Sequence, residues 1–319
     1  MKPTLGMTAK DSRENILRAL RSAEPYVADG YVLLSAPDAE LEAMAAQHVA
    51  YPVSFDAYND THLDGAMACT VKRTECCRRM TERGHRWALL LDSDDTFLPG
   101  GSLPSVPEEV DAVMLTAVMG PTRMRAPKLL RLGQCDWVWA GAPHETLIIP
   151  DAAIVADWSA LPYEATPRER SVEIHLEHAA AFKERLGIDP SDARAAFYLA
   201  ISLDHAGEHA VAYDAYQRRI QLGGWPEEVF WSHLHAGRLA AQSGRDGDAV
   251  GHFVAAATIA PKRAEPYYSL AVHHRDAGHI DAAERLMALA GEQPYPSDAV
   301  MFVETAAYSP EALAAAGMA

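Results

Sequence analysis

The sequence is poor in cysteine, and its few cysteines are badly placed for chemistry. Among 319 residues there are four, Cys69, Cys76, Cys77 and Cys135, and no two of them form a C-x-x-C pair. Adjacent Cys76 and Cys77 would make a strained disulfide and a poor metal chelate. We therefore expect free thiols in a reducing compartment, and neither a disulfide framework nor a zinc site.

Positive charge is also scarce. The chain has 28 Lys and Arg against 44 Asp and Glu, and its formal net charge is −16. Partners such as a nucleic-acid backbone or an anionic membrane require clustered Lys and Arg, so this balance argues against both. It still allows a local basic groove that binds a phosphate-bearing ligand.

Long apolar runs are absent as well. No run approaches 18 apolar residues, and residues 1–10 carry no apolar core of the signal type. We expect no membrane span and a soluble, cytoplasmic protein. Hydrophobic residues make up 49% of the chain and charged residues 23%. The chain can therefore bury a core, and its length suggests two domains.

An internal repeat is present in the C-terminal half. Gly207, Gly244 and Gly278 each lie between two helical patterns, and the second spacing is 34 residues, the tetratricopeptide period. The first spacing is 37 residues, and the turn formers at residues 223–226 account for the extra length. The spacing predicts helical hairpins of the tetratricopeptide type from about Asp192 onward.

Small and large residues recur at fixed offsets from these glycines. Small residues let the two helices of a hairpin approach closely, and a large residue fills the space beside them. The small positions are Ala200, Gly237 and Ala271, followed by Ala212, Ala249 and Ala283, and the large ones are Tyr216, Phe253 and Met287.

A further helix precedes the three repeats. Residues 172–186 form a helical pattern with Phe182 at the large position, and Pro190 follows it. Such arrays serve as a concave binding surface or as a dimer interface. We expect His273 and His274 to be packed or solvated, because adjacent helical residues point about 100° apart. We expect the same of His233 and His235.

The N-terminal half alternates between apolar runs of strand length and helical patterns. This order predicts an α/β layer with ligands at the carboxyl ends of buried, parallel strands. A helix over residues 11–22 has Asp11 or Ser12 as its cap. The other expected helices cover residues 40–47 and 67–83, and the expected strands cover residues 31–34, 87–91 and 112–118.

Acidic residues follow one of these strands at once. Asp92, Ser93, Asp94 and Asp95 come directly after five apolar residues. Three neighbouring acids are costly to bring together unless something positive lies among them. Mg²⁺ or Mn²⁺ is one candidate, because both prefer oxygen ligands. The alternative is a solvated acidic turn.

Two further groups carry candidate chemistry. His144 can serve as a metal ligand or proton shuttle, and Glu145 beside it as a general base. The alternative for this pair is an ordinary surface turn. Local basic residues, some of which are candidates to hold a diphosphate, are Arg73, Arg78, Arg79, Arg123, Arg125, Lys128 and Arg131.

Several ordered motifs resemble bacterial and phage family 2 glycosyltransferases, in the branch fused to C-terminal tetratricopeptide repeats. Residues 87–95, W-A-L-L-L-D-S-D-D, resemble that family's W-I-L-x-L-D-A-D-E. Residues 128–131 with 139–145 resemble its R-L-F-R and Y-x-G-x-V-H-E, and residues 5–16 resemble its opening L-x-M-I-x-K-N-E-x-x-N-I. The similarity spans nearly the whole chain.

The resemblance implies a fold and a set of roles. It implies an α/β, Rossmann-like GT-A nucleotide-sugar domain over residues 1–165, followed by an all-α repeat domain over residues 166–319. The donor would be a nucleotide sugar, with UDP as the default, and the ion Mn²⁺ or Mg²⁺. By this similarity Asp94 binds the metal, Asp92 contacts the ribose or the metal, and His144 completes the metal shell. Glu145 would be the base; the alternatives are His144, with the roles of the two exchanged, and Asp95.

The rest of the donor site departs from the family pattern. Where the family has D-T-G-S-T-D, residues 35–38 read S-A-P-D, so only Asp38 corresponds. Arg73 lies in a loose counterpart of the family's A-R-N, and Ser93 completes the expected donor-contact set. These departures leave the identity of the nucleotide open.

Three functions remain open from the sequence. The first is a metal-dependent, inverting transfer of a sugar to a protein, peptide or other macromolecular acceptor that the repeats select, with a homodimer as one use of the repeats. The second is a non-catalytic adaptor that binds through the repeats and carries a degenerate glycosyltransferase domain without turnover. The third is a nucleotidyltransferase, which usually requires a glycine-rich phosphate loop that residues 1–20 do not contain.

Overall fold

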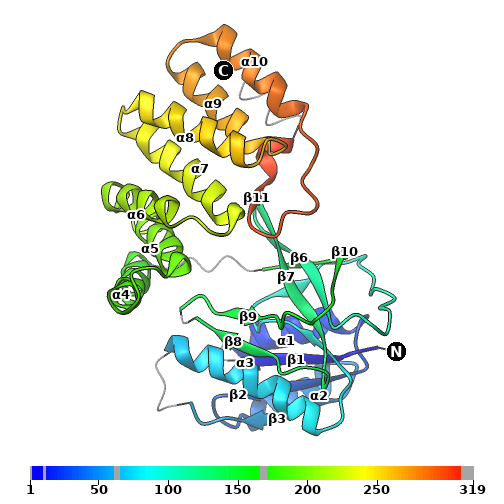
Figure 1. Cartoon of the computed structure of the whole chain (residues 1–319). Helices are drawn as coiled ribbons and strands as arrows, with labels where there is room; N and C mark the ends of the chain where they lie inside the picture. The colour runs from blue at the N-terminus through cyan, green and yellow to red at the C-terminus, as the bar shows by residue number, and fades with distance from the viewer. Residues whose placement is uncertain (1, 10–11, 61–64, 142, 166–170, 310–319) are drawn as a thin grey trace. The chain divides into compact units, whose positions relative to one another are not determined.

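The computed structural model describes residues 2–9, 12–60, 65–141, 143–165 and 171–309. The chain forms two compact units (Figure 1). The first comprises Met1–Gly120 and Arg125–Pro167, and the second comprises Pro121–Met124 and Arg168–Ala319. Asp11, one of the two expected caps, lies outside the described residues.

The first unit begins with a parallel sheet. Its strand order starts β3-β2-β1-β4, and all three of these pairings are parallel. The predicted β-α-β start is confirmed, with Ser12 as the cap of the first helix. The strands are β1 (Thr4–Ala9), β2 (Asp29–Leu34), β3 (Val53–Ala57) and β4 (Trp87–Leu90), and the helices α1 (Arg13–Ala23), α2 (Ala39–His48) and α3 (Gly65–Glu82).

The sheet then becomes mixed. Strand β7 (Thr122–Arg131) runs antiparallel to β4, with Trp87 opposite Arg131. Strand β10 (Val155–Glu164) is parallel to β6 (Ala112–Met119) and antiparallel to β5 (Thr96–Phe97). Strands β8 (Val138–Ala140) and β9 (Thr146–Ile148) form a separate two-stranded sheet.

The second unit is mainly helical hairpins followed by a short strand (Figure 1). No helix among the described residues combines the length and apolar composition needed to cross a bilayer. The helices are α4 (Val172–Ile188), α5 (Ala193–His205), α6 (His209–Leu222), α7 (Pro226–Gln242), α8 (Asp246–Ile259), α9 (Glu265–Asp276) and α10 (Ile280–Gly291). Strand β11 (Val303–Glu304) and the 3₁₀ helix η1 (Thr305–Tyr308) follow.

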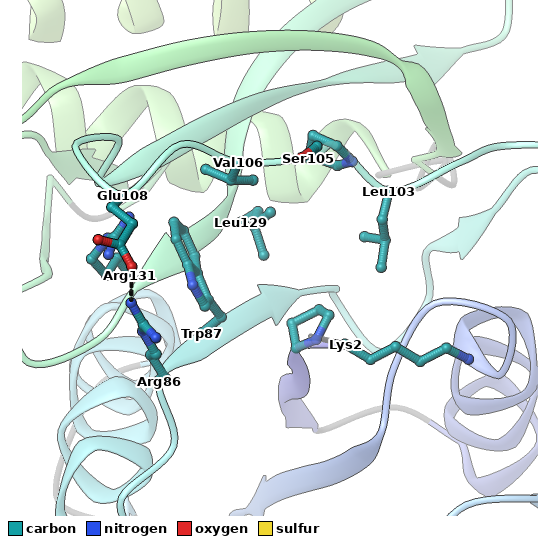
Figure 2. Close-up of a pocket in the computed structure, with 11 residues that line it drawn as sticks. Lys2, Arg86, Trp87, Leu103, Ser105, Val106, Glu108, Leu129 and Arg131 are labelled. Atoms are coloured by element: carbon teal, nitrogen blue, oxygen red, sulfur yellow. Dashed lines mark ion pairs between the residues drawn. The ribbon is translucent and has the colours of Figure 1, made fainter.

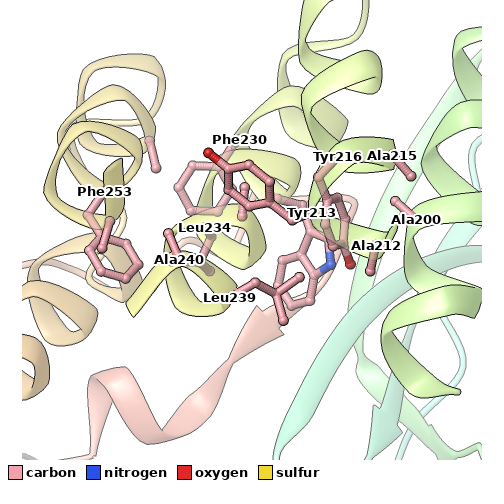
Figure 3. Packing of buried hydrophobic residues seen from close by; sticks show 14 of the residues in the cluster. Ala200, Ala212, Tyr213, Ala215, Tyr216, Phe230, Leu234, Leu239, Ala240 and Phe253 are labelled. Carbon is pink, nitrogen blue, oxygen red and sulfur yellow. The ribbon is translucent and has the colours of Figure 1, made fainter. Parts of the chain in front are cut away.

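The repeat packing is as the sequence predicts. Gly207, Gly244 and Gly278 have φ of +80°, +70° and +80° and end the first helix of each hairpin, where glycine is favoured. A Cβ built on Gly237 would lie 2.6 Å from Cε1 of Phe253. Figure 3 shows Phe253 packed in the buried core of the array, which also contains Tyr216. The small residues of one helix therefore leave the space that the large side chains of its partner helix fill.

The overall layout predicted from the sequence is wrong. A Rossmann-like GT-A layer followed by an all-α domain does not describe this chain. The sheet is mixed, because β5 and β7 run antiparallel to their neighbours β10 and β4. The second unit is not all-α, because β11 pairs with Thr122 and Arg123. A two-residue strand is too short to leave an alternating pattern, so β11 could not be predicted from the sequence.

Candidate functional site

A cluster of opposite charges lies at the carboxyl end of β4. The acids follow that strand, Arg73 comes from α3 and Lys128 from β7. Nη2 of Arg73 is 2.7 Å from Oδ1 of Asp92, and Nζ of Lys128 is 3.4 Å from Oδ2 of Asp92. Lys128 also lies 3.8 Å from Oδ2 of Asp95. Two of the three acids, Asp92 and Asp95, thus lie beside cations of the same chain.

Arg73 joins two of the predicted site groups. Its Nη1 is 3.2 Å from Oε1 of Glu145 while its Nη2 contacts Asp92. Burial opposes the charge of Arg73, but the nearby carboxylates outweigh it and hold the pKa of Arg73 above its ordinary value. Lys128 behaves in the same way: burial lowers its pKa, and Asp92 more than restores it. Both cations therefore stay charged.

The carboxylate of Asp92 faces two cations rather than an open coordination position. Among the residues that the structure describes, no group of three or more His, Cys, Asp or Glu is arranged to hold a metal ion. The metal roles of Asp92, Asp94 and His144 stay predictions, as do the catalytic roles of Glu145 and Asp95.

The remaining predicted residues have local structural contacts. Asp38 accepts a hydrogen bond from the backbone N–H of Leu41 at 3.0 Å and caps α2. It also pairs with Arg13 at 2.8 Å, and this guanidinium holds the pKa of Asp38 below its usual range. Ser93 and Asp94 are buried, and the backbone carbonyl of Asp94 accepts from Arg18 at 3.0 Å.

His144 has an unusual backbone. Its φ is +63°, the one positive value among non-glycine residues in the described part of the chain. An L residue in this region carries strain on the order of 1 kcal/mol or more, and such strain is concentrated at functional sites. His144 lies in the loop between β8 and β9. This geometry singles it out independently of the motif.

A buried lysine was missed by the sequence reasoning. Nζ of Lys72 lies 2.8 Å from Oγ of Ser35 and 3.3 Å from Oδ2 of Asp60, and all but Ser35 are buried. Burial raises the pKa of Asp60, but bonds from Ser35 and Lys72 outweigh it and leave the pKa below its ordinary value. Ser35 stands where the glycosyltransferase family has an acid, and its hydroxyl contacts the Lys72–Asp60 ion pair. The sequence feature that could have identified Lys72 as a site residue is its position next to Arg73.

A cavity of about 420 Å³ lies at the other edge of the parallel strands (Figure 2). Its lining includes Lys2, just before β1, and Trp87, the first residue of β4. The guanidinium of Arg131 lies 4.6 Å from the centre of the Trp87 ring, and Arg86 pairs with Glu108 at 3.7 Å. This is the amino edge, whereas α/β sheets bind ligands at the carboxyl edge.

A second candidate site lies in the repeat unit, where the chain folds back over α7 and α9. Residues 300–308, which we call the C-terminal strap, include β11 and η1. Glu227, Trp231 and Arg238 lie along one face of α7, at spacings of four and seven residues. All three contact the strap.

The strap is held through its main chain. The carboxylate of Glu227 accepts the N–H of Val300 at 3.1 Å and the N–H of Met301 at 2.5 Å. Nη2 of Arg263 donates to the carbonyl of Phe302 at 2.7 Å. Glu265 accepts the N–H of Glu304 at 3.3 Å. Contacts of this kind are available to any extended chain.

Side chains of the strap make more selective contacts. The rings of Phe302 and Trp231 have centroids 5.0 Å apart. Arg238 donates to both oxygens of Glu304, each at 2.6 Å. The hydroxyl of Tyr308 donates to Glu265 at 2.7 Å. Sequence reasoning missed this site, because neither the strap nor the face of α7 carries a motif.

Comparison with known proteins yields only partial structural likenesses. No protein-family model matches this chain, and no curated protein does. A crystal structure of MamA is 20% identical over 38% of this chain and 70% of its own, with a TM-score of 0.36. YrrB, described as a TPR protein with an unusual peptide-binding site, is 16% identical over 38% of this chain and 61% of its own, with a TM-score of 0.34.

The identification as a family 2 glycosyltransferase is therefore wrong. No protein-family model and no curated protein matches this chain, so no comparison supports that family. The motifs that suggested it are short. An apolar strand followed by acids is common in α/β sheets, where ligands and charges gather at strand ends. The departures at residues 35–38 and at Arg73 already weakened the resemblance.

Proposed function

We propose that the protein is a peptide-binding adaptor, and that the face of α7 and α9 holds an extended segment of its partner. One observation carries the proposal. This face already holds the first residues of the strap, Val300 to Phe302, through a carboxylate on their N–H groups and a guanidinium on a carbonyl. A surface with these groups is chemically equipped to bind main chain.

The same face also provides selectivity. Trp231 offers an aromatic surface, and Arg238 offers a planar fork that matches a carboxylate. Tryptophan and arginine are the residues that most often dominate binding energy at interfaces. Stacked helical repeats present such side chains on a continuous surface. These main-chain and side-chain contacts support an adaptor function, which requires no catalytic step.

The proposal is tested by selecting peptides on the full-length protein. A random peptide library displayed on phage is selected against the immobilised chain, and selected peptides are titrated by fluorescence anisotropy. In a chain that carries Glu304→Arg, whose own residue 304 no longer competes for Arg238, we expect Arg238→Gln to weaken their binding about tenfold or more. Arg285→Gln, on an exposed position of α10, removes the same charge and should leave binding unchanged. Equal binding to both variants would place the peptide elsewhere and defeat the proposal.

Metal-dependent transfer of a sugar from a nucleotide sugar is the second candidate. One observation favours it: Arg73 brings Asp92 and Glu145 together at the carboxyl end of β4. Calorimetric titration with UDP-, GDP- and TDP-sugars, with and without Mn²⁺, tests it on the wild type and on Asp94→Ala. Metal-dependent binding that the variant loses supports this candidate, and no binding by the folded wild type counts against it.

Two finer expectations also stay predictions. They are a homodimer formed through the repeat unit and a cytoplasmic location. Sedimentation velocity over a range of concentrations checks the first, and fractionation of cells that produce the protein checks the second.

A further inference from the structure

We propose that the strap is an internal ligand of the α7–α9 face, and that the partner is a segment with an aromatic residue followed two positions later by an acid. The partner exchanges with the strap and takes over its contacts. This inference rests on the proposed function, because it assumes that the face binds peptides in trans. It adds the chemistry of the partner and the way in which access is controlled.

The spacing of the aromatic and the acid follows from strand geometry. Side chains two residues apart in an extended segment point to the same side. Phe302 and Glu304 accordingly both reach α7, where they meet Trp231 and Arg238. Val303, between them, is 2% exposed and belongs to β11. The face therefore selects the first and third residues of an aromatic–x–acid sequence.

The contacts to the two residues before Phe302 do not depend on which side chains those residues carry. Glu227 accepts the N–H groups of Val300 and Met301, which every residue other than proline can supply. A partner segment needs an extended backbone here, without proline at these two positions. The side chains of the partner are thus read mainly by Trp231 and Arg238.

The attachment of the strap favours the closed state. Residues 292–299, between α10 and the strap, form turns and irregular chain. A tether of this length gives the strap an effective concentration on the order of millimolar. Met301 and Val303 are also buried, so release costs apolar contacts. The apparent affinity for a partner is reduced by the fraction of molecules that are closed.

Weakening the strap tests this competition directly. A fluorescent peptide with the sequence of residues 297–309 is titrated by anisotropy with the full-length wild type and with full-length Glu304→Arg. The substitution places like charges together at Arg238, but it leaves the face itself unchanged. We expect the variant to bind the peptide about tenfold or more tightly than the wild type.

Two further variants make the test specific. Glu292→Arg has the same change of charge at an exposed position outside the strap, and we expect it to bind the peptide as the wild type does. Full-length Arg238→Glu should bind a peptide in which Glu304 is replaced by arginine more tightly than the native peptide, which reverses the preference of the wild type. This exchange of charges shows that the peptide occupies the strap's own site.

The outcomes separate the two proposals. If Glu304→Arg melts cooperatively and binds the peptide no better than the wild type, the strap is a fixed part of the fold and the inference is overturned. Selected peptides that still depend on Arg238 would then leave the proposed function standing. If neither the library nor the strap peptide binds any chain, both proposals fail.

Discussion

Arg238 of α7 and Glu304 of β11 form a two-pronged ion pair, with both nitrogen–oxygen distances at 2.6 Å. The two residues lie 66 positions apart in the chain. Burial and the pair oppose each other at Arg238, and the carboxylate leaves the pKa of Arg238 above its ordinary value. The pair therefore stays ionised, and it fastens the strap to the repeat unit.

This pair should contribute measurably to stability. We expect Glu304→Gln to lower the free energy of unfolding by about 1–2 kcal/mol, because a charge-assisted, two-pronged hydrogen bond becomes a weaker neutral one. Urea denaturation followed by circular dichroism measures the change. The reversed pair, Arg238→Glu with Glu304→Arg, should recover most of the loss caused by either substitution alone. No recovery would show that the two side chains do not act as a pair.

Two glycines in neighbouring helices should respond in opposite directions to alanine. In Gly237→Ala the new Cβ would lie 2.6 Å from the Phe253 ring, so we expect a loss of about 1–3 kcal/mol through overpacking. Gly251 on α8 has open space at its Cβ position. There Gly251→Ala should stabilise the chain by about 0.5–1 kcal/mol. Thermal melting of both variants checks the contrast, and a loss of similar size in both would contradict this packing.

A buried ion pair in the repeat unit gives a third expectation. Arg219 is fully buried and donates to Glu228 at 2.8 and 3.0 Å. We expect Arg219→Met to cost about 3–5 kcal/mol, because it leaves Glu228 buried with only Arg194, at 3.2 Å, as a paired cation. The double variant Arg219→Met with Glu228→Gln should cost less than the single one. Chemical denaturation of the wild type, the single variant and the double variant measures these losses. A larger loss in the double variant than in Arg219→Met would contradict the expectation.

Acid should destabilise the repeat unit through a histidine pair. Nδ1 of His233 lies 2.9 Å from Nδ1 of His252, and burial lowers the pKa of His233 to about 4. The unfolded chain binds a proton near pH 6.5, so unfolding takes up protons between these values. Stability is therefore full above about pH 6.5 and falls as the pH decreases toward 4.

The pH dependence is checked by melting temperature across this range. We expect His233→Gln to flatten the decline, because glutamine does not titrate. His48→Gln, at an exposed position at the end of α2, is the control and should retain the wild-type slope. If His233→Gln declines as steeply as the wild type, the pair is not the source of the effect.

The helical repeats could be predicted from the sequence because the contacts that define them are local. Gly237 and Phe253 are 16 positions apart and belong to one hairpin, so their relation recurs in every repeat. The strand–helix alternation at the start of the chain was readable for the same reason. The strap could not be predicted in this way, because Glu227 and Met301 are far apart in the chain. They meet only when the helices between them have packed, and no periodic pattern links them.

The strand-end acids show a different limit. The sequence correctly indicated that Asp92 requires a positive partner, but composition alone does not distinguish an ion from a side chain. Arg73 on α3 and Lys128 on β7 supply that charge, and their proximity depends on how the mixed sheet pairs. Short motifs around these residues suggested a family that the comparisons do not support.

Hydrogen exchange with a bound peptide distinguishes a strap that the peptide displaces from a strap that stays in place. A selected aromatic–x–acid peptide is added to the full-length wild type, and amide exchange is followed by mass spectrometry. Our account predicts faster exchange within residues 300–304 as the peptide replaces the strap, with α7 remaining protected. Unchanged exchange in residues 300–304 at saturating peptide, with new protection elsewhere, would contradict the claim that the α7–α9 face is the peptide site.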